Sequence, residues 1–215
     1  MNGKCEYTAA DITSDESSIS FSIIHGGEKE CSVTLPCIGN HHVLDALIAY
    51  AAGIEAGCDG AKIAKKLSEF HLDGLRQHIE KRRNQTVIID CYNAAPASMK
   101  AAIDVLCEIE PAPGGKRVAV LGDMLELGSR SPELHEEVGE YAVLKGVDML
   151  VCYGEYAKYI AKKADEMGMH CGCSQDKDMV VNYLNFKLSD GDVVLFKASR
   201  GMHMEEIISA YYGKE

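Results

Sequence analysis

The chain has 215 residues, of which 47% are hydrophobic, so it can bury a core of ordinary size. Its 33 acidic and 22 basic residues give a net charge of -11, and no long basic run interrupts that balance. This composition argues against binding to a nucleic-acid backbone. No apolar stretch approaches the roughly 18 residues that a membrane-spanning helix needs, so we expect no membrane insertion.

Nine cysteines are spread along the chain, several of them inside apolar runs where a free thiol behaves as a small hydrophobic group. Their odd number favours a reducing cytoplasm without a disulfide framework. Cys171 and Cys173 stand next to His170, but no second pair follows at the spacing of a zinc site. We therefore expect a cytoplasmic chain that holds no metal of its own.

The segment up to about residue 75 contains a hairpin and two helices. Residues 18–36 alternate between apolar and polar positions and turn through Gly26 and Gly27, which predicts the hairpin. An apolar stripe marks the first helix, and Asp59 is the expected N-cap of the second. The stripe consists of Val43, Leu47, Tyr50 and Ile54. Because three short elements bury little surface, this segment is thin for a free-standing domain.

From Gln77 onward, apolar strands alternate with helices of ordinary length, which predicts a parallel sheet with right-handed crossovers. The strands are apolar throughout, as expected where helices cover both faces of a sheet. The expected strands are 87–92, 117–124, 147–154, a weak one at 169–173, and 192–199. The expected helices are 96–109, one beginning at Ser131, 155–167, 176–187 and 202–212.

Three of these strands end in polar or glycine-containing turns, at 90–93, 122–126 and 197–201. A parallel sheet aligns the carboxyl ends of its strands, so the three turns can face one crevice. Each turn taken singly also fits ordinary turn chemistry, in which Asn, Asp and Gly are common. Three turns on one edge, with Lys197 and Arg200 in the last, favour a site for an anionic ligand.

The familiar phosphate-binding and hydrolase motifs are absent from the sequence. Neither G-x-x-x-x-G-K-[ST] nor G-x-G-x-x-G occurs, which argues against a P-loop or a dinucleotide fingerprint within this chain. No G-x-S-x-G elbow is present either, which argues against an α/β hydrolase. A receiver-like regulator would need an acidic pair at the first strand, and none is found there.

Four stretches in the same order resemble the Mur ligases, the ATP-dependent amide-forming enzymes of peptidoglycan synthesis. The family member that adds D-alanyl-D-alanine has roughly D-x-Y-N-A-N-P-x-S-M where this chain has DCYNAAPASM at 90–99. The other stretches are LPCIGNHHVLDALIA (35–49), AVLGDMLELG (119–128) with LHEEVG (134–139), and KASRGMHMEEII (197–208). The resemblance covers the chain from about Leu35 to Ile208.

The resemblance implies a three-domain enzyme of which this chain is the last part. Residues 1–79 would be the end of the central ATPase domain, and 80–215 the whole C-terminal, Rossmann-like domain. We thus expect an α/β fold in which a doubly wound, mostly parallel sheet of about six strands follows a hairpin-plus-helices remnant. The missing N-terminal and central domains would be its partners.

The reaction implied by the resemblance joins D-alanyl-D-alanine to a UDP-N-acetylmuramoyl-tripeptide. ATP phosphorylates the carboxylate of the UDP-muramoyl-peptide, the incoming amine displaces phosphate from the acyl phosphate, and Mg²⁺ neutralises the phosphate charges. Because the P-loop and the metal ligands lie outside this chain, no catalytic residue is assigned here. The chain alone is expected to be inactive.

The site residues carry over by position in the motifs. His42, Arg76 and Asp90 correspond to ATP-binding positions, with His42 near adenine, Arg76 near the phosphates and Asp90 near the ribose. For the incoming dipeptide, the expected substrate-binding residues are Asn93, Ser199 and Arg200.

Three positions depart from the family pattern. His42 replaces an Asn that contacts adenine, Asp45 replaces an Asn one helical turn from His41, and Ala95 replaces the second Asn of the 90–99 motif. Losing an Asn N-cap at position 95 would cost about 1 kcal/mol. These departures leave two alternatives open, a non-catalytic binding module of the same fold and a related Mur ligase that adds a different amino acid.

Overall fold

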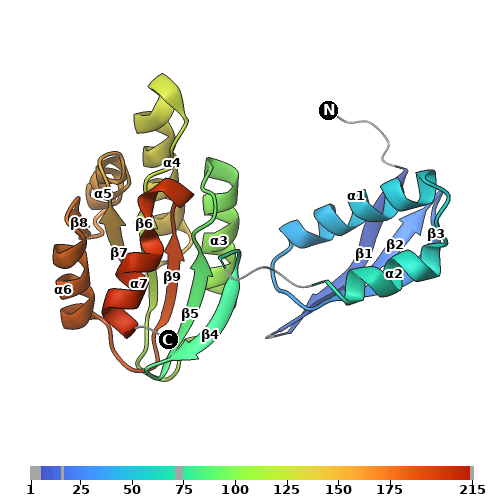
Figure 1. The fold of residues 1–215 in the computed structure, drawn as a ribbon, viewed down its shortest axis with the longest axis horizontal. Helices are drawn as coiled ribbons and strands as arrows, with labels where there is room; N and C mark the ends of the chain where they lie inside the picture. Colours follow the sequence, from blue (N-terminus) through green and yellow to red (C-terminus); the bar gives the residue numbers. More distant parts are fainter. Residues whose placement is uncertain (1–5, 16, 71–74, 214–215) are drawn as a thin grey trace. The chain divides into compact units, whose positions relative to one another are not determined.

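The structure is a computed structural model that describes residues 6–15, 17–70 and 75–213. The chain divides into two compact units, Met1–Leu72 and Asp73–Glu215, shown in Figure 1. The division lies seven residues before the domain boundary expected at 79/80. Residues 78–82 form a strand of the second sheet, which places them in the second unit.

Unit 1 is a three-stranded antiparallel sheet followed by two helices. The strands are β1 (Tyr7–Ser14), β2 (Ile19–His25) and β3 (Glu28–Leu35), in the order β1-β2-β3. The expected hairpin is β2–β3, and its turn uses Gly26 and Gly27 at positive φ, as tight hairpin turns require. The helices are α1 (His41–Glu55) and α2 (Gly60–Ser68).

Unit 1 has a hydrophobic core of its own, although the sequence suggested a segment too thin to fold by itself. Alternate residues of β2 are buried against β3 and the inner face of α1. The largest members are Ile19, Phe21, Ile23, Val33, Leu35, Val43 and Tyr50. The expected N-cap is confirmed, since the Asp59 carboxylate accepts the N–H of Lys62 at 3.0 Å.

Unit 2 is built around a six-stranded sheet in the order β4-β5-β9-β6-β7-β8. All neighbours are parallel except β4, which pairs antiparallel with β5. The strands are β4 (His78–Arg82), β5 (Gln85–Asp90), β6 (Arg117–Gly122), β7 (Met149–Tyr153), β8 (Gly172–Ser174) and β9 (Val193–Lys197). The expected doubly wound, mostly parallel sheet is confirmed.

Helices cover both faces of this sheet (Figure 1). On one face α3 (Pro96–Glu108), α4 (Ser131–Leu144) and α5 (Ala157–Glu166) pack in succession. On the other face α6 (Lys177–Lys187) packs beside α7 (Met204–Tyr212). Short 3₁₀ turns, η1 (Gly128–Arg130) and η2 (Arg200–Met202), precede α4 and α7.

The strands of unit 2 are buried on both sides because successive side chains point to opposite faces. Val87, Val120 and Phe196 pack with Leu184 of α6 and Ile207 of α7. The intervening side chains, among them Ile88, Leu121 and Leu195, are also fully buried. This two-sided burial explains the continuous apolar runs in the sequence. Among the residues that the structure describes, no helix has both the length and the apolarity to cross a bilayer.

Candidate functional site

The three polar turns singled out in the sequence follow neighbouring strands. In the parallel register, Lys197 at the end of β9 lies beside Asp90 of β5 on one side and Leu121 of β6 on the other. The turns that follow β5, β9 and β6 therefore share one edge of the sheet. This is the edge where open α/β sheets place their ligands.

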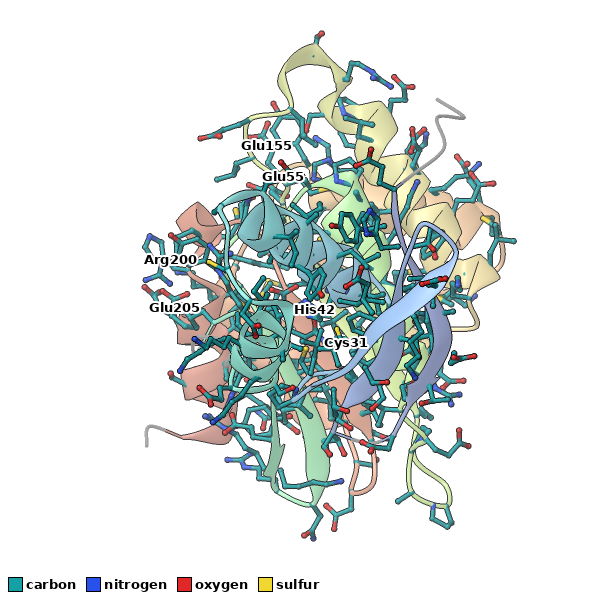
Figure 2. All side chains as sticks on the ribbon, turned by 90° about the vertical axis from the view of Figure 1, so that its right-hand side faces the viewer. Cys31, His42, Glu55, Glu155, Arg200 and Glu205 are labelled. Atoms are coloured by element: carbon teal, nitrogen blue, oxygen red, sulfur yellow. The ribbon has the colours of Figure 1, made fainter. Side chains whose placement is uncertain are left out.

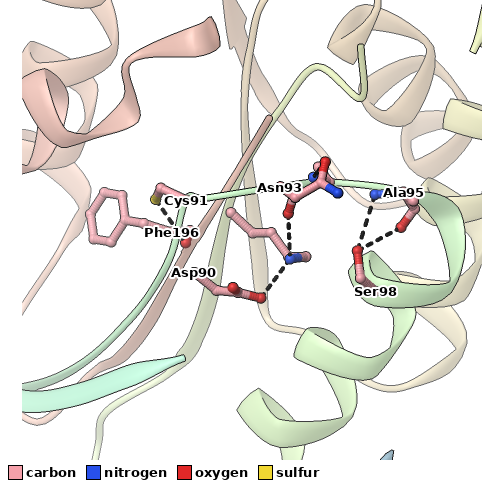
Figure 3. Close-up of polar contacts among 8 residues, drawn as sticks. Asp90, Cys91, Asn93, Ala95, Ser98 and Phe196 are labelled. Carbon is pink, nitrogen blue, oxygen red and sulfur yellow. Dashed lines mark hydrogen bonds and ion pairs between the residues drawn. The ribbon is translucent and has the colours of Figure 1, made fainter. Parts of the chain in front are cut away.

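A buried lysine joins two of the residues at this edge (Figure 3). Lys197 is 1% exposed, and its Nζ donates to Asp90 Oδ2 at 2.5 Å and to the Asn93 carbonyl oxygen at 3.1 Å. The Asp90 side chain remains 19% exposed, so the carboxylate is accessible at the rim of the edge. The sequence placed Lys197 in a turn that favours an anionic ligand, but its ammonium group is instead buried against the Asp90 carboxylate. The sequence signal for this burial was a lysine directly after four apolar strand residues, because a buried lysine needs a partner for its charge.

The stretch from Cys91 to Ala95, called the junction below, leads from β5 into α3. The Asn93 side-chain oxygen accepts the N–H of Ala94 at 2.8 Å, and Asn93 itself is exposed. Ala95 occupies the N-cap position as expected, and Ser98 Oγ accepts its N–H at 3.0 Å (Figure 3). Ser98 thus satisfies one donor at the helix start, although the family's Asn is missing.

Cys91 is a structural member of this junction. Its Sγ donates to the Phe196 carbonyl oxygen at 3.3 Å, and burial raises the pKa of its thiol to about 12. The thiolate is the nucleophilic form of cysteine, so Cys91 is unreactive at neutral pH.

The turn after β6 is held by polar side chains that have structural tasks. Asp123 is 4% exposed, and its carboxylate accepts three backbone N–H groups at the start of α5, from Glu155, Tyr156 and Ala157. Ser199 Oγ accepts the N–H of Leu125 at 2.9 Å. Ser199, expected at the dipeptide site, is thus 6% exposed and engaged in supporting this turn.

His135 supports the same turn from α4. Its Nδ1 lies 2.6 Å from the Ser131 carbonyl oxygen and its Nε2 lies 2.9 Å from the Met124 N–H. A carbonyl only accepts and an amide N–H only donates, so the neutral tautomer with the proton on Nδ1 fits both contacts. Burial lowers the pKa of the His135 imidazole. Nothing in the sequence pattern distinguished this histidine from a surface residue of a helix.

Two arginines near the edge are exposed. The Arg76 guanidinium lies 4.1 Å from the centroid of the Tyr92 ring, a cation–π contact. Arg200 pairs with Glu205, with 3.0 Å between Nη1 and Oε1; Figure 2 labels both residues. The expected residues Arg76, Asp90 and Asn93 therefore come together around the end of β5.

His42 lies in unit 1, on α1 (Figure 2). Its ring centroid is 4.0 Å from that of His41, and its Nδ1 is 3.7 Å from Asp45 Oδ2. Two of the positions that depart from the family pattern therefore contact each other. The described part of the chain contains no group of three or more His, Cys, Asp or Glu residues arranged to hold a metal ion. Its eight described cysteines are free.

Residues 76–200 match the family described as "Mur ligase, glutamate ligase domain". The chain belongs to the Mur ligase family. The matched region begins at Arg76 and ends at Arg200, so it contains the whole edge formed by β5, β9 and β6.

Curated relatives point to one member of this family. The chain is 36% identical over 213 residues to the UDP-N-acetylmuramoyl-tripeptide--D-alanyl-D-alanine ligase of Bacillus subtilis (strain 168), covering 94% of this chain and 44% of that protein. It is 34% identical over 181 residues to the ligase of the same name from Escherichia coli (strain K12), covering 83% and 38%. The chain thus spans less than half the length of these relatives.

Solved structures with a similar fold include enzymes of the same family. A crystal structure of MurF from Acinetobacter baumannii has a TM-score of 0.86 at 27% identity, covering 97% of this chain and 45% of that one. The MurF ligase of Thermotoga maritima, solved in complex with ADP, has a TM-score of 0.77 at 25% identity, covering 96% and 46%. Both similarities extend over unit 1 as well as unit 2.

Proposed function

We propose that this chain is the C-terminal part of an ATP-dependent ligase that adds D-alanyl-D-alanine to a UDP-N-acetylmuramoyl-tripeptide. The relatives with that name, and the ADP complex of a similar ligase, support the substrates and the nucleotide. Unit 1 would be the end of the central ATPase domain, and unit 2 the C-terminal domain. A reducing cytoplasm fits the free cysteines of the described residues.

The observation that carries the proposal is the grouping of Arg76, Asp90 and Asn93 around the end of β5. An exposed guanidinium suits a phosphate group, and a partly exposed carboxylate can accept hydrogen bonds from ribose hydroxyls. Arg76 fits a bound ATP at its phosphates, and Asp90 fits it at its ribose. His42 would lie near adenine, and Asn93, Ser199 and Arg200 would serve the dipeptide, Ser199 by supporting the turn after β6.

When bound, ATP supplies the phosphoryl group that activates the substrate carboxylate. The residues of this chain bind and orient the nucleotide, and they offer no set of carboxylates for Mg²⁺ among the described residues. The magnesium site and the phosphate-binding loop would belong to the preceding domains.

A chimera tests the proposed function. It joins the preceding part of the Bacillus subtilis ligase to residues 1–215, and phosphate release is measured with ATP, Mg²⁺, UDP-N-acetylmuramoyl-tripeptide and D-alanyl-D-alanine. The Bacillus enzyme is the positive control. Release that depends on D-alanyl-D-alanine supports the proposal. Release only with a single amino acid would indicate a different Mur ligase, and a folded chimera without release would indicate a non-catalytic module.

The 215 residues alone are expected to release no phosphate. Phosphoryl transfer needs backbone amides and a lysine around the phosphates, and the P-loop sequence that supplies them is absent from this chain. Without that cage, ATP should bind with a dissociation constant of about 1 mM or weaker. Calorimetry with ATP checks this directly, and micromolar binding would reveal a nucleotide site of another kind.

A further inference from the structure

Lys197 occupies an unusual position for a lysine. It is the last residue of β9, follows four buried apolar residues and is itself 1% exposed. Moving an ammonium group out of water costs several kcal/mol unless acceptors replace the lost hydration. Two acceptors are in place, the Asp90 carboxylate and the Asn93 carbonyl oxygen (Figure 3).

These two contacts fix different parts of the edge. Asp90 lies directly opposite Lys197 in the parallel register, so the ion pair joins the ends of β5 and β9. Asn93 lies three residues further along, inside the junction, so the same ammonium group also holds the backbone that enters α3. Among the described contacts Lys197 engages only Oδ2 of Asp90, which leaves Oδ1 of this partly exposed carboxylate as an acceptor.

Stability alone does not account for this arrangement. Replacing a buried ion pair with apolar or neutral side chains of similar volume is often neutral or stabilising, and a methionine would fill much of the space of Lys197. An ion pair with two defined acceptors does provide a fixed geometry, because a charged side chain in the interior cannot change rotamer without losing its partners.

We propose that Lys197 is a positioning residue, whose ammonium group holds the Asp90 carboxylate in the orientation that receives the nucleotide and ties the junction to the end of β9. This inference rests on the proposed function for the identity of the ligand. The part that concerns the junction stands on the contacts alone. Lys197 does not touch the ligand itself and acts through Asp90.

The first experiment uses the 215-residue chain without any ligand. Lys197→Met, Asp90→Asn and the double variant are compared by hydrogen exchange at the amides of Ala94 and Ala95, together with urea unfolding. Lys197→Met leaves an uncompensated carboxylate and should lower stability, and Asp90→Asn in the same chain should restore much of it. The junction amides should still exchange about tenfold faster in the double variant than in the wild type, because the tie to the Asn93 carbonyl is lost.

A matched control pair lies elsewhere in unit 2. Lys145 Nζ contacts Asp104 Oδ1 at 2.5 Å, but both side chains are about 40% exposed, at 42% and 38%. The double variant Lys145→Met/Asp104→Asn should leave exchange at the junction unchanged. Junction exchange at the wild-type rate in a folded Lys197→Met/Asp90→Asn chain would overturn the inference.

The second experiment uses the chimera described above. Lys197→Met should lower kcat/KM for ATP by about 10- to 100-fold, mainly through the KM for ATP. The KM for D-alanyl-D-alanine should rise by a smaller factor, because Asn93 lies in the junction that Lys197 holds. Lys197→Arg keeps the charge and should recover part of the loss. The Lys145→Met/Asp104→Asn chimera should keep the parent kinetics.

The decisive comparison is a double-mutant cycle. If Lys197 acts on the nucleotide through Asp90, kcat/KM for ATP in the Lys197→Met/Asp90→Asn variant should be no more than about twofold below that of Asp90→Asn alone. Losses that multiply would show an independent role and overturn the inference. If the parent chimera is inactive, the proposed function fails, and hydrogen exchange at the junction then decides whether Lys197 holds it.

Discussion

Replacing Asp123 with Ala removes the acceptor that holds the first amides of α5. The carboxylate receives the N–H groups of Glu155 at 3.0 Å, Tyr156 at 3.0 Å and Ala157 at 2.7 Å, from a position that is 4% exposed. A helix start cannot satisfy these donors from within the helix. Asp123 therefore acts as an N-cap for α5 although it lies more than 30 residues earlier, at the end of β6.

The loss in unfolding free energy depends on which of the three N–H groups water can reach after the substitution. Losing an N-cap side chain costs about 0.5–2 kcal/mol. Glu155 is exposed and Tyr156 half-buried, so water can take over their N–H groups, whereas Ala157 is buried and its N–H would stay unpaired. A stranded buried donor adds about 1–3 kcal/mol. We expect Asp123→Ala to lower the unfolding free energy of unit 2 by about 3 kcal/mol.

Denaturant unfolding followed by hydrogen exchange in β6 and β9 measures this loss in unit 2 alone. The control is Asp176→Ala, because Asp176 caps α6 through the N–H groups of Asp178 at 2.8 Å and Met179 at 3.4 Å but is exposed. Water can take the place of the Asp176 carboxylate at the start of α6, so we expect a loss of about 1 kcal/mol or less in unfolding free energy. Equal losses for the two variants would refute the reasoning that burial of the donors sets the cost.

Three further changes test other contacts. Burial lowers the pKa of His135, so the unfolded chain binds the proton first as the pH falls. The contribution of His135 to the stability of unit 2 should therefore be fully present above the ordinary pKa of 6.5 and be lost as the pH drops below it, and His135→Gln should flatten that slope in urea titrations. Gly154→Ala places a Cβ 2.2 Å from Asp123 Oδ1 at a φ of +133°, so it should lower the free energy of unfolding by well over roughly 1 kcal/mol. The control is Gly146→Ala, where nothing lies within 4 Å of the new Cβ and a loss of roughly 1 kcal/mol is expected; matched melting curves compare the two. In the chimera, Arg76→Ala should raise the KM for ATP roughly 10- to 100-fold through the loss of a charge-assisted phosphate contact, and an unchanged ATP KM with a raised dipeptide KM would show that Arg76 serves the other substrate.

The alternation of strands and helices after Gln77 could be predicted because its strands are apolar on both faces. Two strands were not predicted, because their residues are largely charged or exposed. Strand β4 (His78–Arg82) consists largely of charged residues at the sheet edge, and β1 (Tyr7–Ser14) is mostly exposed and bulged between Ala10 and Thr13. A strand with one solvated edge and little burial leaves no apolar pattern to read.

At the candidate site, the common edge was predictable and the contacts within it were not. Parallel strands bring their carboxyl ends together whatever the side chains are, so the grouping of the three turns followed from the fold class. The partners did not follow, because Lys197 meets Asp90 across 107 residues and Ser199 meets Leu125 across 74. Such long-range pairings depend on the strand order, in which β9 inserts between β5 and β6.

The two outer strands of the unit 2 sheet have a consequence for the behaviour of the protein at high concentration. An outer strand carries unpaired N–H and C=O groups, which can recruit a strand from another molecule. Strand β4 carries Glu80, Lys81 and Arg82, with Glu80 and Arg82 in an ion pair, and β8 is only three residues long. A strand added to β4 from a second molecule would bring like charges together or remove the charged side chains of β4 from water. Strand β8 offers too few backbone N–H and C=O groups for stable pairing with another strand. Both edges of the sheet are thus protected against the sheet extension that begins aggregation.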